Sequence, residues 1–277
     1  MAKLFDYSKI AEGKHFVGRD EEVKRLSSDF IFLTNTAIIA PDGWGKSSLV
    51  HKAAGDAMHK EKALRFCFTD LSNVRNEERF YELLVQGVLK AVSRNQSEVV
   101  ENVKKYFCST SPRVTFDTEG SFTVDFDWDD IRRNQDELID LPFVVVKDKG
   151  LKLVVCIDDF NAIGRFSDPD GLLERLKNRW KRHEDVTYCI CASPVSFVDK
   201  FLKSVPMFYR YGDIIHIGHV SRKDMVGSLR EKFADSARYL DNEIAGLIYD
   251  IVGGNAFYTQ QLAHLSWLGT SVVCSRE

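Results

Sequence analysis

The stretch that decides the fold runs from Ala37 to Val50 and reads Ala-Ile-Ile-Ala-Pro-Asp-Gly-Trp-Gly-Lys-Ser-Ser-Leu-Val. Short β-prone residues lead into a loop of proline, aspartate and glycine. Gly45-Lys46-Ser47 then opens an apolar helical pattern. A strand, a glycine-containing loop and a helix in this order are the context that a phosphate-binding loop requires. The stretch therefore predicts a site for the phosphates of a nucleotide.

The residue types in this loop fit that chemistry. Gly43 and Gly45 tolerate the dihedrals that turn backbone N–H groups toward anionic oxygens, and the next helix adds the partial positive charge of its N-terminus. Lys46 would reach the β- and γ-phosphates, and the Ser47 hydroxyl would ligate Mg²⁺. Ala40 stands where the motif usually has its first glycine, and alanine is the smallest change available there. The residues predicted to bind nucleotide are Ala40, Pro41, Asp42, Gly43, Trp44, Gly45, Lys46, Ser47 and Ser48. The alternative interpretation is a polar turn before a helix that happens to begin with Gly-Lys-Ser.

Composition excludes some classes of protein. The chain has 277 residues, 44% of them apolar, which is enough for one large domain or two ordinary ones. Lys and Arg (38) nearly balance Asp and Glu (41), so nucleic acid is not indicated as the main partner, although a local basic patch stays open. Charges interrupt every apolar run, and the N-terminus lacks the pattern of a signal peptide. Six cysteines without Cys-x-x-Cys spacing favour reduced thiols. We therefore expect a cytoplasmic protein that does not enter a membrane.

A second candidate site follows the apolar run from Leu151 to Ile157. This run is typical of a strand buried on both faces of a parallel sheet, and it ends in Asp158-Asp159-Phe160. Acidic residues at the carboxyl end of such a strand lie at the sheet edge where ligands bind. Asp158 would hold Mg²⁺, directly or through water, and Asp159 could orient the attacking water. Alternatively, the two carboxylates cap the following helix.

The rest of the chain alternates between helical and strand patterns, which predicts an α/β fold with a mainly parallel sheet. Expected strands are residues 36–39, 64–69, 151–157, 186–192 and 213–218, and expected helices are 46–59, 77–93, 97–107, 129–140, 221–233, 241–252 and 256–268. Pro142 would lie just beyond the helix at 129–140. An insertion at about 112–128 alternates apolar and polar residues around a turn at 118–121, which predicts a β-hairpin. Strand signals stop near residue 220, so we expect a nucleotide-binding domain at 1–220 and a helical lid domain at 221–277.

Six segments in this order carry a resemblance to a known family. They are Phe16–Glu22, Ala40–Ser48, Leu153–Phe160, Cys189–Ser193, Pro206–Asp213 and Gly253–Leu262. Together they make the chain similar to the AAA-type ATPases of the STAND group, and most similar to the archaeal/bacterial (Bacteroides-type) ATPase family. The resemblance implies a P-loop NTPase fold, a three-layer α/β sandwich followed by a small helical lid. It also implies ATP or ADP and Mg²⁺ as ligands.

The resemblance assigns roles to residues outside the loop. Gly18 and Arg19 belong to a motif whose neighbourhood packs near the adenine, and Ser193 corresponds to a polar group that senses the nucleotide. Arg210 would reach the γ-phosphate of a neighbouring subunit, or it would pair on the surface with Asp213 or Asp199. The catalytic residues implied are thus Asp159, Ser193 and Arg210, and the metal ligands are Ser47 and Asp158.

This chain departs from the family pattern in ways that bear on mechanism. Asp159 replaces the usual glutamate, so its carboxylate sits one methylene further from a water at the γ-phosphate. General-base geometry is sensitive to such displacements, and a loss of about a hundredfold is expected. Ala256 replaces the lid proline, and no Arg or Lys occurs between Gly253 and Leu268. The resemblance also implies winged-helix-like and nuclease-like regions after the lid, and we expect that they are missing after Glu277 either naturally or by truncation.

These observations leave three functions open. The leading hypothesis is a slow Mg-dependent ATPase that works as a nucleotide-driven conformational switch and couples lid position to an unidentified protein partner. The second is a nucleotide-binding interaction module without useful hydrolysis, which Asp159 and Ala40 favour. The third is a DNA-associated ATPase, against which the balanced charge argues. The basic stretch Lys177–His183 could contact nucleic acid or form the solvated face of a helix. Self-assembly into a homo-oligomer is not decided by the sequence.

Overall fold

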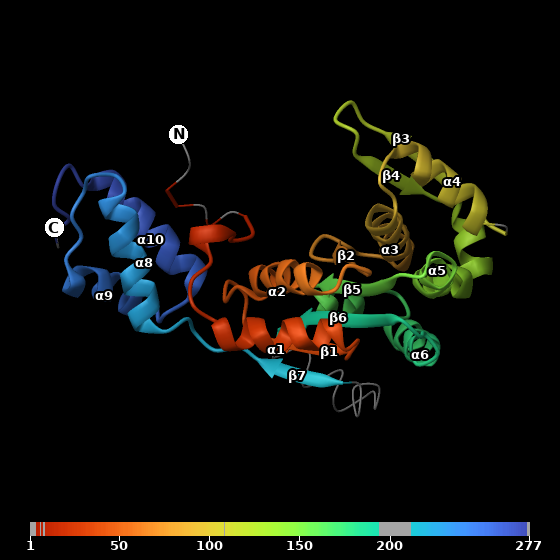
Figure 1. Cartoon of the computed structure of the whole chain (residues 1–277), viewed down its shortest axis with the longest axis horizontal. Coiled ribbons are helices and arrows are strands. Elements are labelled where there is room, and N and C mark those ends of the chain that lie inside the picture. Colours follow the sequence, from red (N-terminus) through yellow and green to blue (C-terminus); the bar gives the residue numbers. More distant parts are fainter. Residues whose placement is uncertain (1–3, 6, 8, 108, 194–211, 276–277) are drawn as a thin grey trace. The chain divides into compact units, whose positions relative to one another are not determined.

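The computed structural model describes the whole chain except residues 1–3, 6, 8, 108, 194–211 and 276–277 (Figure 1). The chain divides into two compact units. One unit comprises Met1–Leu26, Ala40–Ala53 and His216–Glu277, and the other comprises Ser27–Ile39 and Ala54–Ile215. The proposed domain boundary near residue 220 stays a prediction. Among the described residues, no helix is both long enough and apolar enough to cross a membrane.

Among the described residues, five strands form one sheet in the order β2-β5-β6-β1-β7. The strands are β1 (Thr36–Ile39), β2 (Leu64–Asp70), β5 (Lys152–Asp158), β6 (Val186–Ala192) and β7 (Asp213–His216). The pairs β2–β5, β5–β6 and β1–β6 are parallel, which confirms the predicted sheet. Parallel pairing brings the carboxyl ends of these strands to one edge of the sheet. In this register Ile39 lies opposite Ala192, and Asp158 lies opposite Asp70.

Helices lie beside this sheet (Figure 1). In the described part of the chain, the helices before the lid are η1 (Gly13–His15), α1 (Asp20–Ile31), α2 (Lys46–Lys60), α3 (Glu77–Val92), α4 (Gln96–Tyr106), α5 (Trp128–Lys149), η2 (Phe160–Arg165) and α6 (Pro169–Trp180). Buried side chains of α3, α5 and α6 share one hydrophobic core with the strands of the sheet. All seven residues of β6 are buried, as are five of the seven in β5. Helix α3 approaches β2 closely at Gly87, where the Cβ of any larger residue would lie 2.6 Å from the Cys67 sulfur. The central strands β5 and β6 are therefore buried between the helices, and this packing holds the residues at their carboxyl ends in place.

The predicted β-hairpin is present. Strands β3 (Arg113–Phe116) and β4 (Phe122–Asp125) pair antiparallel, with Val114 opposite Val124. The turn is closed by the Asp117 N–H, which donates to the Ser121 carbonyl at 2.9 Å. The inner face of the hairpin joins the core through Val124, which is completely buried.

The helix that follows the hairpin is longer than the sequence predicts. We expected a helix from Asp129 to about Asp140 with Pro142 just beyond it, yet α5 has a kink at Asn134 and then continues to Lys149 with Pro142 inside it. A proline in a helix interior costs about 3 kcal/mol. Burial of each large apolar side chain contributes about 1.5–3 kcal/mol, and Leu141, Val145 and Val146 are all buried in this region. Tertiary packing therefore outweighs the local preference, and the prediction of a helix end before Pro142 was wrong.

The described residues of the lid form the helices α8 (Arg222–Ala234), α9 (Asn242–Ile251) and α10 (Ala256–Gly269). The Ser221 hydroxyl accepts a hydrogen bond from the Asp224 N–H at 3.1 Å, so the predicted capping interaction starts α8. The lid core also contains an unexpected residue, Phe5, which is 4% exposed. Its ring lies 6.0 Å from the ring of Phe233 in an edge-to-face contact and 5.8 Å from the ring of His264. The N-terminal segment is therefore part of the lid core.

Candidate functional site

The phosphate loop begins where β1 ends. Ala40 is 1% exposed, so its methyl group is enclosed where the motif usually has glycine. Gly43 and Gly45 have φ angles of 78° and 88°, in the left-handed region that glycine adopts without a steric penalty. Helix α2 starts at Lys46, directly after the second of these glycines. The local backbone is therefore a glycine-dependent turn joined to a helix N-terminus, the arrangement that suits an anion.

Lys46 points its ammonium group back into the loop. Its Nζ donates to the carbonyl oxygen of Ala40 at 2.9 Å and to that of Pro41 at 3.3 Å. It also lies 3.1 Å from the Oδ1 atom of Asp42. The Lys46 side chain is only 9% exposed, so the protein shields most of it from water. A phosphate that approaches this ammonium must replace some of these oxygens.

Arg19, in the motif Phe16–Glu22, contacts the backbone of the phosphate loop. Its guanidinium donates to the carbonyl oxygen of Trp44 at 2.9 Å and to that of Gly218 at 2.7 Å. Burial lowers the pKa of Arg19, and the charge of Glu22 opposes this shift. Gly18 precedes it with a φ angle of 64°. The structure thus gives Arg19 a positioning role toward the loop backbone.

The lid contributes contacts that we did not predict from the sequence. The backbone N–H of Phe257, in the first turn of α10, donates to the Gly43 carbonyl at 3.0 Å. The Asn255 amide donates to the Asp42 carbonyl at 3.2 Å. The ring of His219 meets the ring of Trp44 edge-on, with centroids 4.0 Å apart. Asn255 and Phe257 belong to the segment Gly253–Leu262 of the family resemblance, but nothing in the local sequence pairs them, or His219, with the phosphate loop.

Ser48, the last predicted residue of the loop, contacts the N-terminal segment. Its hydroxyl accepts a hydrogen bond from the backbone N–H of Ala11 at 3.0 Å. Gly18, Arg19 and the loop from Ala40 to Ser48 all belong to the compact unit that contains the lid. The structure therefore brings together the residues predicted to bind nucleotide.

The second group of predicted residues lies at the carboxyl edge of the sheet, in the other unit. The Asp158 carboxylate accepts a hydrogen bond from the backbone N–H of Asp159 at 3.0 Å. The Asp159 carboxylate accepts one from the Asn161 amide at 2.9 Å. The Asn161 side-chain oxygen in turn accepts from the backbone N–H of Ser193 at 3.1 Å. Asn161, which no sequence pattern singled out, thus links two predicted catalytic residues.

The alternative role of Asp159 as a helix cap finds no support among the described residues. Asp159 stands at the N-cap position of η2, but its side chain makes no capping hydrogen bond there. Its backbone has φ 48° and ψ 47°, a left-handed conformation that is uncommon for a residue with a side chain. Arg165 lies 3.9 Å from its carboxylate. The carboxylate is therefore oriented by the side chain of Asn161.

Two further predictions concern Arg210 and the stretch Lys177–His183. Arg210 and Asp199 lie outside the described residues, so the role of Arg210 stays a prediction. In the basic stretch Lys177–His183, Arg179 pairs with Asp140 and burial lowers the pKa of His183, whereas Lys181 and Arg182 are exposed. The nucleic-acid interpretation of this stretch stays a prediction.

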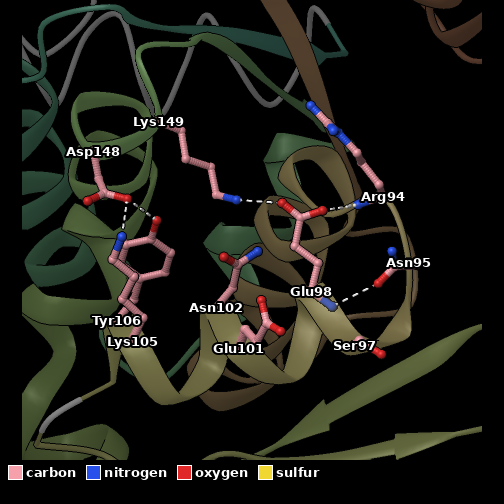
Figure 2. A pocket seen from close by; sticks show the side chains of 10 residues that line it. All are labelled: Arg94, Asn95, Ser97, Glu98, Glu101, Asn102, Lys105, Tyr106, Asp148 and Lys149. Carbon is pink, nitrogen blue, oxygen red and sulfur yellow. Dashed lines mark hydrogen bonds and ion pairs between the residues drawn. The ribbon is translucent and has the colours of Figure 1, made fainter.

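A polar hollow of about 540 Å³ lies between α4 and α5, apart from the predicted site residues (Figure 2). It is lined by Arg94, Asn95, Ser97, Glu98, Glu101, Asn102, Lys105, Tyr106, Asp148 and Lys149. Figure 2 shows two ion pairs within it, in which Lys149 meets Glu98 at 2.7 Å and Lys105 meets Asp148 at 2.6 Å. These internal pairs leave no clear excess of either charge to recognise a ligand.

The sheet order, the phosphate loop after β1 and the acidic pair after β5 define a P-loop NTPase fold of the AAA+ type. A family model described as an ATPase domain predominantly from Archaea matches residues 16–262. The chain belongs to this family of ATPase domains, which confirms the resemblance seen in the sequence. No curated protein sequence matched the chain significantly.

Solved structures show the same fold at low sequence identity. The ORC2 protein of Aeropyrum pernix, solved with ADPNP and ADP, has a TM-score of 0.62 at 14% identity over 95% of this chain and 64% of that one. A Walker-type ATPase of Pyrococcus abyssi has a TM-score of 0.63 at 16% identity, covering 96% and 72% of the two chains. The Aeropyrum pernix ORC1 protein, solved in complex with DNA, has a TM-score of 0.62 at 10% identity, covering 95% and 64%. This chain thus spans just under two thirds of the length of the two ORC proteins.

Proposed function

We propose that this chain binds ATP and Mg²⁺ through the loop at residues 40–48, hydrolyses ATP slowly and acts as a nucleotide-driven conformational switch. Membership of an ATPase family supports the binding of nucleotide and its hydrolysis. The observation that carries the switch is the pair of hydrogen bonds from α10 to the loop, made by Phe257 and Asn255. A change in the loop on phosphate binding alters these bonds directly, so lid position and nucleotide state are coupled.

We assign Mg²⁺ to one oxygen donor from each compact unit. Ser47 offers a hydroxyl at the start of α2, and Asp158 offers a carboxylate at the end of β5. Hard oxygen ligands of this kind suit Mg²⁺, which is usually held by one or two protein groups together with phosphates and water. When bound, the ion would neutralise charge on the β- and γ-phosphates. Lys46 would then hold the phosphates as a point charge, while Asp159 orients the attacking water.

Slow turnover follows from the position of Asp159. The aspartate side chain is one methylene shorter than the glutamate usual here, and its carboxylate accepts a hydrogen bond from Asn161. Both features limit how closely the carboxylate can approach an attacking water. The same observation favours the second candidate function, a nucleotide-binding interaction module that does not hydrolyse ATP usefully. In either case the lid would present the nucleotide state to a protein partner. The cytoplasmic location, the STAND grouping and the identity of that partner stay predictions.

Phosphate release from Mg-ATP, measured together with binding of a fluorescent ATP analogue, tests the proposed function. Wild type should bind the analogue and release phosphate slowly, and Lys46→Ala should lose most of both, because it deletes the ammonium that meets the phosphates. Equal binding by the two proteins would contradict the assignment of the loop. Firm binding without measurable release would instead select the interaction module.

A further inference from the structure

Asp42 places a carboxylate inside the phosphate loop. Its Oδ1 atom lies 3.1 Å from the Lys46 ammonium, and its side chain is 93% exposed. The ammonium that meets this carboxylate is the same group that would meet the terminal phosphates of a nucleotide. We propose that Asp42 competes with the terminal phosphate for Lys46, and that the lid residue Asn255 holds Asp42 in the competing position. The proposal rests on the function proposed above and concerns the regulation of that site.

Competition follows from charge. A carboxylate oxygen and a phosphate oxygen are both anionic acceptors, and a nearby carboxylate repels a phosphate that approaches the same ammonium. ATP carries one more phosphate and more negative charge than ADP, so Asp42 disfavours ATP more than ADP. Because Asp42 is exposed, water and salt screen the effect, and it amounts to a modest bias. Asp42 thus acts as a specificity-determining residue between the two nucleotides.

Asn255 supplies the link to the lid. Its amide nitrogen donates to the main-chain oxygen of Asp42 at 3.2 Å, while its side-chain oxygen accepts from the Tyr258 N–H at 3.1 Å and caps α10. The next carbonyl of the loop, that of Gly43, accepts from the Phe257 N–H at 3.0 Å. Two successive peptide units of the loop are therefore bonded to one turn of the lid. Departure of this turn frees the Asp42 backbone, so lid movement changes the competition at Lys46.

Three variants separate the effect of the Asp42 charge from the effect of its contact with Asn255. Asp42→Asn removes the charge and keeps the size of the side chain. Asn255→Ser keeps an oxygen that can cap α10 but is too short to reach the Asp42 carbonyl. The double variant measures their coupling. Glu231→Gln serves as the matched control, since it removes an exposed carboxylate from α8 in the same compact unit.

The measurement is equilibrium binding of fluorescent ADP and of a non-hydrolysable ATP analogue, each with Mg²⁺, at low and high salt. Asp42→Asn should bind the ATP analogue about tenfold more tightly and ADP about threefold more tightly, with smaller gains at high salt. Asn255→Ser should shift affinity in the same direction by a smaller factor. The double variant should match Asp42→Asn, because Asn255 acts through Asp42.

The outcomes distinguish this proposal from the proposed function. If wild type binds nucleotide and Asp42→Asn binds no more tightly, the competition is refuted and the nucleotide site stands. If Glu231→Gln tightens binding as much as Asp42→Asn, net charge is the cause and the proposal fails. If the affinity of the double variant rises by the product of the two single increases, Asn255 acts independently of Asp42 and its proposed role in holding Asp42 is refuted. Absence of binding in wild type and all variants would overturn both proposals.

Discussion

Asp159 is the residue at which this chain departs from the glutamate usual in its family's motif. In the proposed mechanism the Asp159 carboxylate lies one methylene further from the attacking water than a glutamate carboxylate would, so Asp159→Glu should raise turnover, by up to about a hundredfold. Asp159→Asn should lower turnover with little change in ATP affinity, since only the transition state uses that carboxylate. Single-turnover hydrolysis measures both effects. Thermal melts are the control, because glutamate suits the left-handed backbone at this position less well. A change in melting temperature without a change in rate would count against a catalytic role.

The lowered pKa of the buried Lys232 should make the free energy of unfolding depend on pH. Its side chain is buried in the lid, where Nζ donates to the Gln260 side chain at 2.7 Å and lies 5.5 Å from the centre of the Phe5 ring. Burial, aided by the charge of Lys14, lowers the pKa of Lys232 to about 8 from an ordinary value of 10.5. Between these values the unfolded chain binds the proton and the folded chain does not, so stability rises with pH across this window, by up to about 3 kcal/mol.

Urea unfolding at several values between pH 7 and pH 10.5 measures this effect. Wild type should become more stable above pH 8, and Lys232→Met should flatten the rise because methionine does not titrate. A fall in stability as the pH rises from 8 to 10.5 would contradict the prediction, because it would mean that the folded protein holds the lysine proton more tightly than the unfolded chain does. A rise of equal size in both proteins would assign the effect to other groups.

At the scale of elements, the N-terminal segment is a structural part of the lid. Phe5 packs against Phe233, His264 and Trp267, so Phe5→Ala leaves a cavity in the small lid core. We expect the free energy of unfolding of this unit to fall by about 3 kcal/mol. A thermal melt measures the loss. The exposed Phe32, on the chain between α1 and β1, offers a matched control, because Phe32→Ala removes a ring that is 80% exposed. Similar losses in the two variants would show that Phe5 is not part of a packed core.

At the scale of the whole molecule, nucleotide binding should be visible as stability. A ligand that binds only the folded state stabilises it by about 2.7 kcal/mol at a hundred times its Kd. The loop and the lid share one compact unit, so ADP with Mg²⁺ should raise the melting temperature of that unit in wild type. Lys46→Ala should show almost none of this rise. Equal shifts in the two proteins would place the nucleotide elsewhere on the chain.

Local sequence determined much of this protein. The strand, loop and helix start between Ala37 and Val50, the buried strand ending at Asp158 and the capping residue Ser221 are each encoded within a few neighbouring residues. Dihedral preference and hydrophobic period act over such short distances. The parallel sheet, the β-hairpin and the ATPase family could therefore be predicted from the sequence alone.

Tertiary structure decided the rest. Helix α5 continues through Pro142 because burial of its apolar face outweighs the missing hydrogen bond. The contacts of Phe5 with the lid and of Asn255 with the phosphate loop join residues more than 200 positions apart. Asn161 is only two residues from Asp159, yet its link to Ser193 depends on the neighbouring strand. Such contacts depend on which surfaces the folded chain brings together, and no local pattern carries that information.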